Sequence, residues 1–247
     1  MSTKDFLKKI KDEDIEYVDV RFTDTRGTLQ HVTIVSDLVD EDFIEEGFMF
    51  DGSSIAGWKS IEASDMKLML DTDTAYVDPF YAEKTICVHC SIVEPDTNEP
   101  YERDPRGTAQ KAEAYLKSSG IGDVAYMGPE AEFFLFDNVK FSNTINKVSY
   151  EVDASDGSWN TDTDFEMGNM GHRPGLKGGY FPVNPTDEAQ DLRAEMLSTM
   201  KRLGMKVDKH HHEVGSCQHE LGLIFGTLTE QADEIQKYKY IIHNVAH

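Results

Sequence analysis

The segment HHHEVGSCQHE, residues 210–220, concentrates side chains that bind metal ions. It contains four histidines, one cysteine and two glutamates, Glu213 and Glu220. On one straight strand these glutamates would face opposite sides, because side chains alternate along a strand and the two are seven residues apart. Gly215 and Ser216 lie between them and favour a turn. We therefore predict a hairpin that brings both carboxylates to one face.

A second pair of carboxylates, Glu130 and Glu132, lies in PEAEFFLF, within a predicted strand over residues 124–136. Residues two apart on a strand share a face, so the two negative charges would lie side by side. Among phenylalanines this is costly unless a cation neutralises them, and the alternative is an exposed edge with two solvated glutamates. Carboxylate oxygens suit Mg²⁺ or Mn²⁺, which commonly bridge nucleotide phosphates. Because the sequence has neither GxxxxGK[ST] nor a GxGxxG after a strand, such metal ions would have to hold the phosphates.

Zinc is the alternative cation, because the histidines from His210 to His212, together with Cys217 and His219, supply nitrogen and sulfur ligands. The segment lacks the H-E-x-x-H spacing that places two histidines on one helical face. On a strand, consecutive histidines alternate faces, so only His210 and His212 could share a side. The motif CVHC at residues 87–90 lies in a strand pattern and is predicted to pack in the core.

The elements that must position these residues follow from hydrophobic periodicity and turn residues. Residues 1–103 are predicted to form a small, strand-rich α+β domain, and NEPYERDPRG at 98–107 is the expected boundary before a second domain over 104–247. The predicted elements are an N-terminal helix, strands at 17–24 and 84–93, helices at 108–118, 186–204 and 229–245, and a long irregular segment at 137–179.

The ends of the last two helices carry separate signals. Thr186 is expected to cap the helix over 186–204, and Gly204 is expected to stop it. Thr229 is expected to cap the last helix, whose apolar stripe continues to the final residue, His247, without a stop signal. A chain that ends in the middle of a helical pattern is expected to be truncated.

Composition narrows the classes of partner. The chain has 247 residues, with 46 acidic against 24 basic side chains and a formal net charge of −22. This charge opposes nonspecific binding to nucleic acids and to anionic membranes. No apolar run approaches the roughly 18 residues that span a membrane, and the N-terminus lacks the pattern of a signal peptide. The odd number of cysteines, three, is typical of a reducing compartment, so we expect a cytoplasmic protein.

Five segments together resemble type I glutamine synthetase: FDGSSIAGW (50–58), GPEAEFFLFD (128–137), KGGYFPVNPTDEAQDLRAEM (177–196), HHHEVGSCQHE (210–220) and ADEIQKYKYIIHNVAH (232–247). They stand in the order of that family and at about its spacing along the whole chain. The resemblance implies a β-grasp-like N-terminal domain followed by an α/β catalytic domain with a curved antiparallel sheet, here cut short.

The same resemblance implies ATP-dependent ligation of ammonia to L-glutamate, which gives L-glutamine, ADP and phosphate through γ-glutamyl phosphate. Two divalent cations, Mg²⁺ or Mn²⁺, would serve each complete site. Glu132, Glu213 and Glu220 correspond to ligands of the cation nearer the substrate, and Glu130 to a ligand of the cation nearer the ATP phosphates. Phosphoryl transfer between two anions agrees with this, because it needs positive charge at the transferring group.

The resemblance also implies a pocket for ammonium. Asp51 would bind ammonium and accept its proton, since only neutral ammonia is nucleophilic, and Ser54, Tyr180 and Glu213 would complete the pocket. Without the resemblance, the Asp51-Gly52 dipeptide would be interpreted as a structural turn.

Three residues match positions near the nucleotide in the same family: Asp208, His211 and Phe225. The family usually has glutamate where this chain has Asp208, so the contact made there is expected to differ.

Type I glutamine synthetases continue to roughly twice this length and build each active site between neighbouring identical subunits, in two stacked six-membered rings. The continuation carries the remaining metal ligands and the arginines that bind glutamate and phosphate. The 247 residues alone are therefore expected to be inactive. Two alternatives stay open: a γ-glutamyl ligase of the same superfamily that uses another amine, and a non-catalytic truncated homologue.

Overall fold

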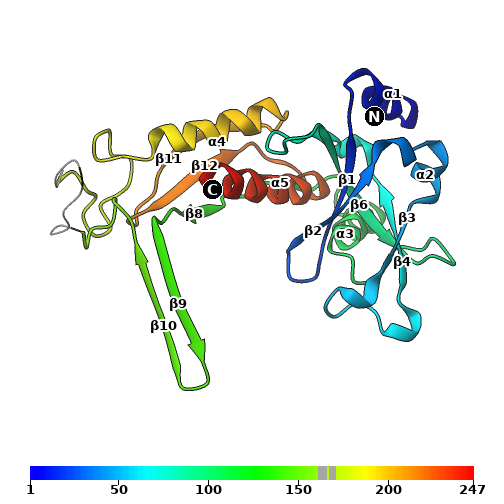
Figure 1. Ribbon diagram of the computed structural model, residues 1–247, viewed down its shortest axis with the longest axis horizontal. Helices are drawn as coiled ribbons and strands as arrows, with labels where there is room; N and C mark the ends of the chain where they lie inside the picture. The colour runs from blue at the N-terminus through cyan, green and yellow to red at the C-terminus, as the bar shows by residue number, and fades with distance from the viewer. Residues whose placement is uncertain (161–165, 167–170) are drawn as a thin grey trace. The chain divides into compact units, whose positions relative to one another are not determined.

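The computed structural model describes residues 1–160, 166 and 171–247, and it separates into two compact units (Figure 1). Unit 1 comprises Met1–Met127 and Gly226–Lys237, and unit 2 comprises Gly128–Phe225 and Tyr238–His247. The predicted domain boundary after residue 103 stays a prediction. None of the helices in the described part of the chain is long and apolar enough to cross a membrane.

Unit 1 is built on a mixed sheet with the strand order β2-β1-β6-β4-β3, and β5 also pairs with β6. Strands β1 and β6 are parallel, and the other pairs are antiparallel. The strands are β1 (Tyr17–Thr23), β2 (Leu29–Val35), β3 (Phe48–Asp51), β4 (Asp65–Leu70), β5 (Tyr76–Val77) and β6 (Thr85–Val93). The predicted strands at 17–24 and 84–93 are confirmed as β1 and β6.

The two faces of this sheet have different chemistry because side chains alternate along β1 and β6. One face carries the apolar core, into which α1 (Thr3–Asp12) and α2 (Glu41–Glu46) pack. The core of unit 1 includes Phe6, Ile10, Val18, Val20, Phe22, Ile44, Met66, Leu68, Ile86, Val88, Cys90 and Ile92. Cys87 and Cys90 are both buried, which confirms that the CVHC motif packs inside the unit.

The opposite face of the sheet is buried and charged. Arg21, which is 2% exposed, donates to Asp19 at 2.6 Å and to Asp78 at 3.1 Å. Arg106 of α3 (Pro105–Ser119) donates to Asp71 and to Asp233, a residue of the last helix, α5 (Leu228–Ala246). Buried charges of this kind are tolerated when they are paired and hydrogen-bonded. The ion pairs fix α3 and the first part of α5 to the sheet.

Unit 2 contains a three-stranded antiparallel sheet with the order β11-β12-β8. Its elements are β8 (Glu132–Phe134), β9 (Asn138–Thr144), β10 (Lys147–Asp153), α4 (Gln190–Arg202), β11 (Val207–His212) and β12 (Gln218–Leu223). Helix α4 packs on β11 and β12 and buries Met196 and Met200, and Leu221 of β12 is also buried. The last residues of α5 add Tyr238, Ile241 and Ile242 to the buried set.

Two predictions about the middle of the chain are wrong. The predicted strand over 124–136 is broken at Gly128 and Pro129 into β7 (Tyr126–Met127) and β8, and β7 pairs with β13 (Gly226–Thr227) instead. The predicted irregular segment at 137–179 contains the β9–β10 hairpin, which extends away from the three-stranded sheet (Figure 1). The part of that prediction at 161–165 and 167–170 lies outside the described residues.

The helix ends correct two further predictions. Helix α4 starts at Gln190 and has no side-chain cap, so Thr186 does not cap it. Thr229 lies inside the first turn of α5, where its hydroxyl donates to Glu113 at 2.7 Å rather than capping the helix. Gly204 follows α4 with φ +82°, a conformation that glycine adopts without strain, so the predicted stop is confirmed.

Candidate functional site

The predicted hairpin at residues 210–220 is present. Strands β11 and β12 pair antiparallel, with His211 opposite Glu220 and His212 opposite His219. The backbone N–H of Glu213 donates to the carbonyl oxygen of Gln218 at 2.7 Å and closes the turn. Glu213 lies two residues beyond His211, so its side chain returns to the face of the sheet that carries Glu220.

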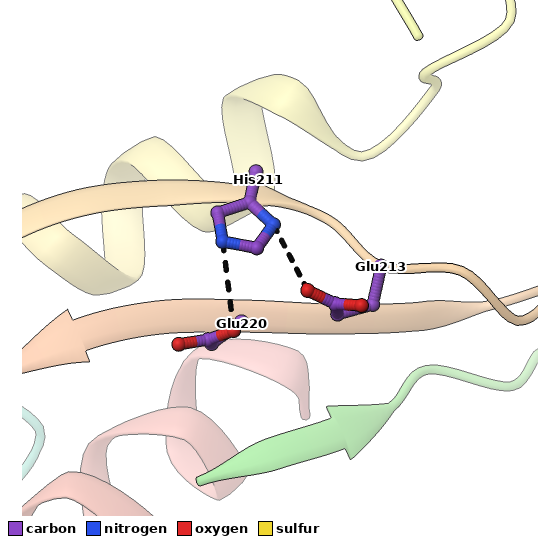
Figure 2. A group of neighbouring side chains, drawn as sticks. All are labelled: His211, Glu213 and Glu220. Atoms are coloured by element: carbon purple, nitrogen blue, oxygen red, sulfur yellow. Dashed lines mark ion pairs between the residues drawn. The ribbon is translucent and has the colours of Figure 1, made fainter. Parts of the chain in front are cut away.

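Figure 2 shows the cluster that results on this face, where the His211 ring lies between the carboxylates of Glu213 and Glu220. The His211 Nδ1 is 3.4 Å from Glu213 Oε1, and its Nε2 is 3.5 Å from Glu220 Oε2. One ligand atom from each residue lies within 4.8 Å of the others. Both glutamates are 8% exposed, and the His211 side chain is 10% exposed. Three possible ligands thus converge in a nearly buried position.

Strand β8 adds a third carboxylate to the same row, because Glu132 pairs in register with Glu220. Its Oε2 accepts a hydrogen bond of 2.6 Å from the Nε2 of Gln218. Glu130 precedes the strand, and both Glu130 and Glu132 are exposed. The sheet therefore brings Glu132 beside the cluster, while the exposed-edge alternative also fits the pair Glu130 and Glu132.

The electrostatics of the cluster favour a bound cation. Burial raises the pKa of Glu220, the charges of Glu213 and Glu130 raise it further, and His211 opposes them. In the part of the chain that the structure describes, no lysine or arginine forms an ion pair with Glu213 or Glu220. Lys209 also opposes the rise of the Glu220 pKa through its charge. Two nearly buried carboxylates together with an imidazole form a donor set that fits a divalent cation.

The other histidines of the segment face α4 on the reverse side of the sheet. Arg193 of α4 contacts the Nδ1 of His219 at 3.0 Å and donates to the Nδ1 of His210 at 3.4 Å. Burial lowers the pKa of His219 to about 3, and the Arg193 charge adds to this effect. Burial would lower the pKa of His212, yet its hydrogen bonds to Asp156 and to the carbonyl of Glu213 raise it.

This reverse face does not provide the zinc site considered from the sequence. Among the described residues, the potential metal-binding group contains His211, and not His210, His212 or Cys217. Cys217 is buried, and this burial raises the pKa of its thiol to about 12.

Two residues of the expected ammonium pocket, Asp51 and Ser54, lie together in unit 1 at the end of β3. The Asp51 carboxylate accepts hydrogen bonds from the Ser53 hydroxyl at 2.6 Å, the Ser53 N–H at 2.8 Å and the Ser54 hydroxyl at 2.9 Å. These bonds, with those from Ser53 first, lower the pKa of Asp51 and keep it ionised.

The other two residues of that pocket, Tyr180 and Glu213, belong to unit 2. The N–H of Gly179 donates to the carbonyl of Val214 at 3.1 Å, so the chain around Tyr180 runs beside the end of β11. The Tyr180 ring meets the His211 ring edge-on, with their centroids 5.7 Å apart. The side chain of Tyr180, 56% exposed, is thus brought beside the carboxylate and histidine cluster.

Of the residues expected near the nucleotide, Asp208 and His211 lie on the β11–β12 hairpin and Phe225 lies after it. Asp208 lies at an irregularity of the β11–β12 pairing, with 49% of its side chain exposed, against Gly222. His211 lies inside the cluster. Phe225 follows β12, is 60% exposed and packs beside Gly128. Of the three, the structure places only His211 among the candidate metal ligands.

Three residues of the site were not predicted from the sequence. Gln218 contacts Glu132 and is two residues before Glu220, so strand alternation would have placed it on the cluster face. Arg193 lies within the helix predicted over residues 186–204, but no role was predicted for its side chain. Asp156, which contacts His212 and the Cys217 N–H, comes from a distant loop, and no local pattern marks it.

The cluster of carboxylates and a histidine on the antiparallel sheet is typical of proteins that bind a divalent metal ion. Residues 14–95 match the description "Glutamine synthetase, beta-Grasp domain", and residues 102–247 match "Glutamine synthetase, catalytic domain". The chain therefore belongs to the glutamine synthetase family, and the predicted β-grasp domain followed by a catalytic domain is confirmed.

Relatives and solved structures agree with this family. The chain is 76% identical over 98% of its length to a glutamine synthetase of Cereibacter sphaeroides and 72% identical over its whole length to one of Rhodobacter capsulatus. It spans about half of these relatives, 52% and 56% of their lengths. A Plasmodium falciparum glutamine synthetase structure matches all of the chain, and 48% of that structure's chain is covered, with a TM-score of 0.90 and 25% identity. A structure of GmaS, at 18% identity and a TM-score of 0.72, shares the fold.

Proposed function

We propose that the chain forms part of an enzyme that ligates ammonia to L-glutamate with ATP and yields L-glutamine, ADP and phosphate. The observation that supports this most directly is the convergence of His211, Glu213 and Glu220, with Glu132 on the adjoining strand. The relatives that are 76% and 72% identical carry the name glutamine synthetase, which agrees with the proposal.

The carboxylates are proposed to bind Mg²⁺ or Mn²⁺. Glu132, Glu213 and Glu220 would hold one cation, and Glu130 would contribute to a second. When bound, these cations would offset the negative charge that ATP and glutamate bring to the transferring phosphoryl group. The chain's own contribution is to hold the carboxylates in a fixed row on β8, β12 and the β11 turn.

Asp51 is proposed to bind ammonium and to accept its proton. Its hydrogen bonds from Ser53 and Ser54 keep it a carboxylate, which attracts the cation. Ser54, Tyr180 and Glu213 are proposed to complete this pocket.

Further proposals concern the nucleotide, the assembly and the compartment. Asp208, His211 and Phe225 are proposed to lie near the ATP, His211 at the phosphate side because it adjoins the cluster. Neighbouring identical subunits are proposed to complete each active site in a dodecamer, in the cytoplasm. Neither nucleic acid nor membrane is a proposed partner.

The function is tested by γ-glutamyl hydroxamate formation with Mn²⁺, and by glutamine formation from glutamate, ATP and ammonia. We expect turnover by the full-length protein and none by the 247 residues alone. Putrescine and methylamine in place of ammonia test the alternative amine ligase. Turnover with these amines but not with ammonia would overturn the proposal, and absence of any turnover would favour a non-catalytic homologue.

A further inference from the structure

Asp156 joins the two sides of the turn that carries the metal-binding carboxylates. Its Oδ2 accepts the backbone N–H of Cys217 at 2.5 Å and lies 3.0 Å from the Nε2 of His212. His212 is the last residue of β11, and Cys217 directly precedes β12. One oxygen from a separate loop therefore binds both ends of the turn.

The contacts continue from Asp156 to the backbone of the proposed metal ligands. The His212 Nδ1 is 2.6 Å from the carbonyl oxygen of Glu213, so the ring that touches Asp156 also orients the Glu213 peptide. On the other side, Cys217 has φ +64°, a left-handed conformation that costs about 1–2 kcal/mol for a residue with a Cβ. The direction in which β12 leaves the turn, and with it Glu220, depends on this conformation.

The loop that carries Asp156 is itself held in place. The N–H of Gly157 donates to the carbonyl of Ala154 at 2.9 Å, and the side chain of Asn160 donates to Asp153 and to Ala154. Asn160 is 7% exposed. These hydrogen bonds on both sides of Asp156 hold the backbone that positions its carboxylate.

The second oxygen of Asp156 has a different environment. Asp156 Oδ1 is buried and has no hydrogen-bond partner among the described residues. Asp156 lines a cavity of about 260 Å³ with Asp137, Glu188, His212 and His219. Oδ2 of Asp156 therefore makes both contacts with the turn, and Oδ1 makes neither. An asparagine could keep an acceptor on the turn and place its amide nitrogen at the other position.

We propose that Asp156 is a positioning residue of the candidate metal centre. By holding His212 and the Cys217 N–H, it fixes the separation of the Glu213 and Glu220 carboxylates. Mg²⁺ accepts little deviation from octahedral geometry, so a small change of this separation weakens binding. The inference rests on the proposed function only insofar as these carboxylates bind a divalent cation.

The test is Mn²⁺ binding by the full-length protein, measured by isothermal titration calorimetry and by the paramagnetic resonance of free Mn²⁺. We expect Asp156→Ala to weaken binding by about 10- to 100-fold, the range for residues that orient metal ligands. Asp156→Asn should restore binding to within about threefold of wild type, because its amide oxygen can accept the Cys217 N–H. Glu220→Gln removes a proposed ligand of the same site, so its Mn²⁺ affinity shows how far binding falls when the site is lost.

Glu188→Ala is the matched control, because Glu188 lines the same cavity and takes no part in the hydrogen bonds given above for the turn and for the Asp156 loop. It should bind Mn²⁺ like wild type. Should Asp156→Ala not fold, Asp156→Ser replaces it, since its short hydroxyl cannot reach the turn, and the same weakening is expected.

Lower thermal stability of a folded Asp156 variant with unchanged Mn²⁺ affinity would reduce Asp156 to a structural role and overturn the proposal. Equal weakening by Glu188→Ala would also overturn it. Absence of Mn²⁺ binding by wild type would overturn the metal assignment itself. Intact Mn²⁺ binding without ligase turnover would overturn only the proposed reaction and leave the role of Asp156 supported.

Discussion

His211 lies directly opposite Glu220 across the β11–β12 ladder, with its Nε2 3.5 Å from Glu220 Oε2. Its other ring nitrogen is 3.4 Å from Glu213 Oε1, so one imidazole connects two carboxylates that are not themselves paired in register. The hairpin thus supplies a mixed oxygen and nitrogen donor set, although the sequence had indicated only a pair of glutamates.

We predict from this geometry that His211→Asn weakens Mn²⁺ binding by about tenfold or more, because a ring that touches both carboxylates also orients them. Mn²⁺ titration and the KM for ATP should be measured together in the full-length protein. A raised KM for ATP with unchanged Mn²⁺ affinity would instead assign His211 to the nucleotide alone.

Glu132→Ala is predicted to remove Mn²⁺-dependent activity, by at least about 100-fold, because it deletes the only carboxylate that β8 itself adds to the row. Hydroxamate formation by the full-length protein provides the measurement. Glu151→Ala is the control, since Glu151 is an exposed residue of β10 that pairs with Lys140. Retained activity in Glu132→Ala would refute its assignment as a metal ligand.

Local patterns predicted the parts of the fold that depend on neighbouring residues. Gly215 and Ser216 at the centre of the segment indicated the hairpin, and Gly204 indicated the end of α4. The predicted strand at 124–136 failed because its apolar residues continue across Gly128 and Pro129, where the pairing partner changes from β13 to β12. The hydrophobic pattern of one segment does not show that its two halves pair with different strands.

The missed β9–β10 hairpin shows a different limit. Phe141 and Tyr150 pair across it, and each is 81% exposed. The hairpin therefore buries no apolar face of its own, and the alternation of apolar and polar residues along it indicates a strand but no core. The predicted cap at Thr186 failed because α4 starts later, at Gln190, and Asp187 before the helix pairs with Arg193 inside it. Asp156 reaches the site from another segment, so only the folded chain identifies it.

Asp187→Ala is predicted to lower the free energy of unfolding by about 3–5 kcal/mol, because it leaves the guanidinium of Arg193 buried and unpaired. Arg193 is 0% exposed and donates to both oxygens of Asp187, at 2.9 and 2.5 Å. Urea unfolding followed by circular dichroism gives the measurement. Removal of the exposed Lys140–Glu151 pair is the control and should cost at most about 1 kcal/mol. Equal effects of the two changes would contradict the role of the buried pair.

The last prediction concerns His89, which lies on the charged face of β6. Its side chain is 3% exposed, and within the part of the chain that the structure describes its Nε2 has no hydrogen-bond partner. Burial lowers the pKa of His89 to about 4; Asp233 opposes this shift, while Lys237, Arg106 and Arg21 add to it.

Between pH 4 and 6.5 the unfolded chain binds a proton at His89 that the folded chain does not bind. The free energy of unfolding should therefore be constant with respect to His89 above about pH 7 and should fall as the pH is lowered from 6.5 towards 4. The lowering of the His89 pKa from 6.5 to about 4 corresponds to a loss of about 3 kcal/mol in the free energy of unfolding.

His89→Gln removes this proton uptake, so its free energy of unfolding in urea should depend less on pH over that range than that of wild type. His243→Gln, which changes an exposed histidine of α5, is the matched control. Parallel profiles for wild type and His89→Gln would show that His89 is protonated equally in the folded and unfolded chains.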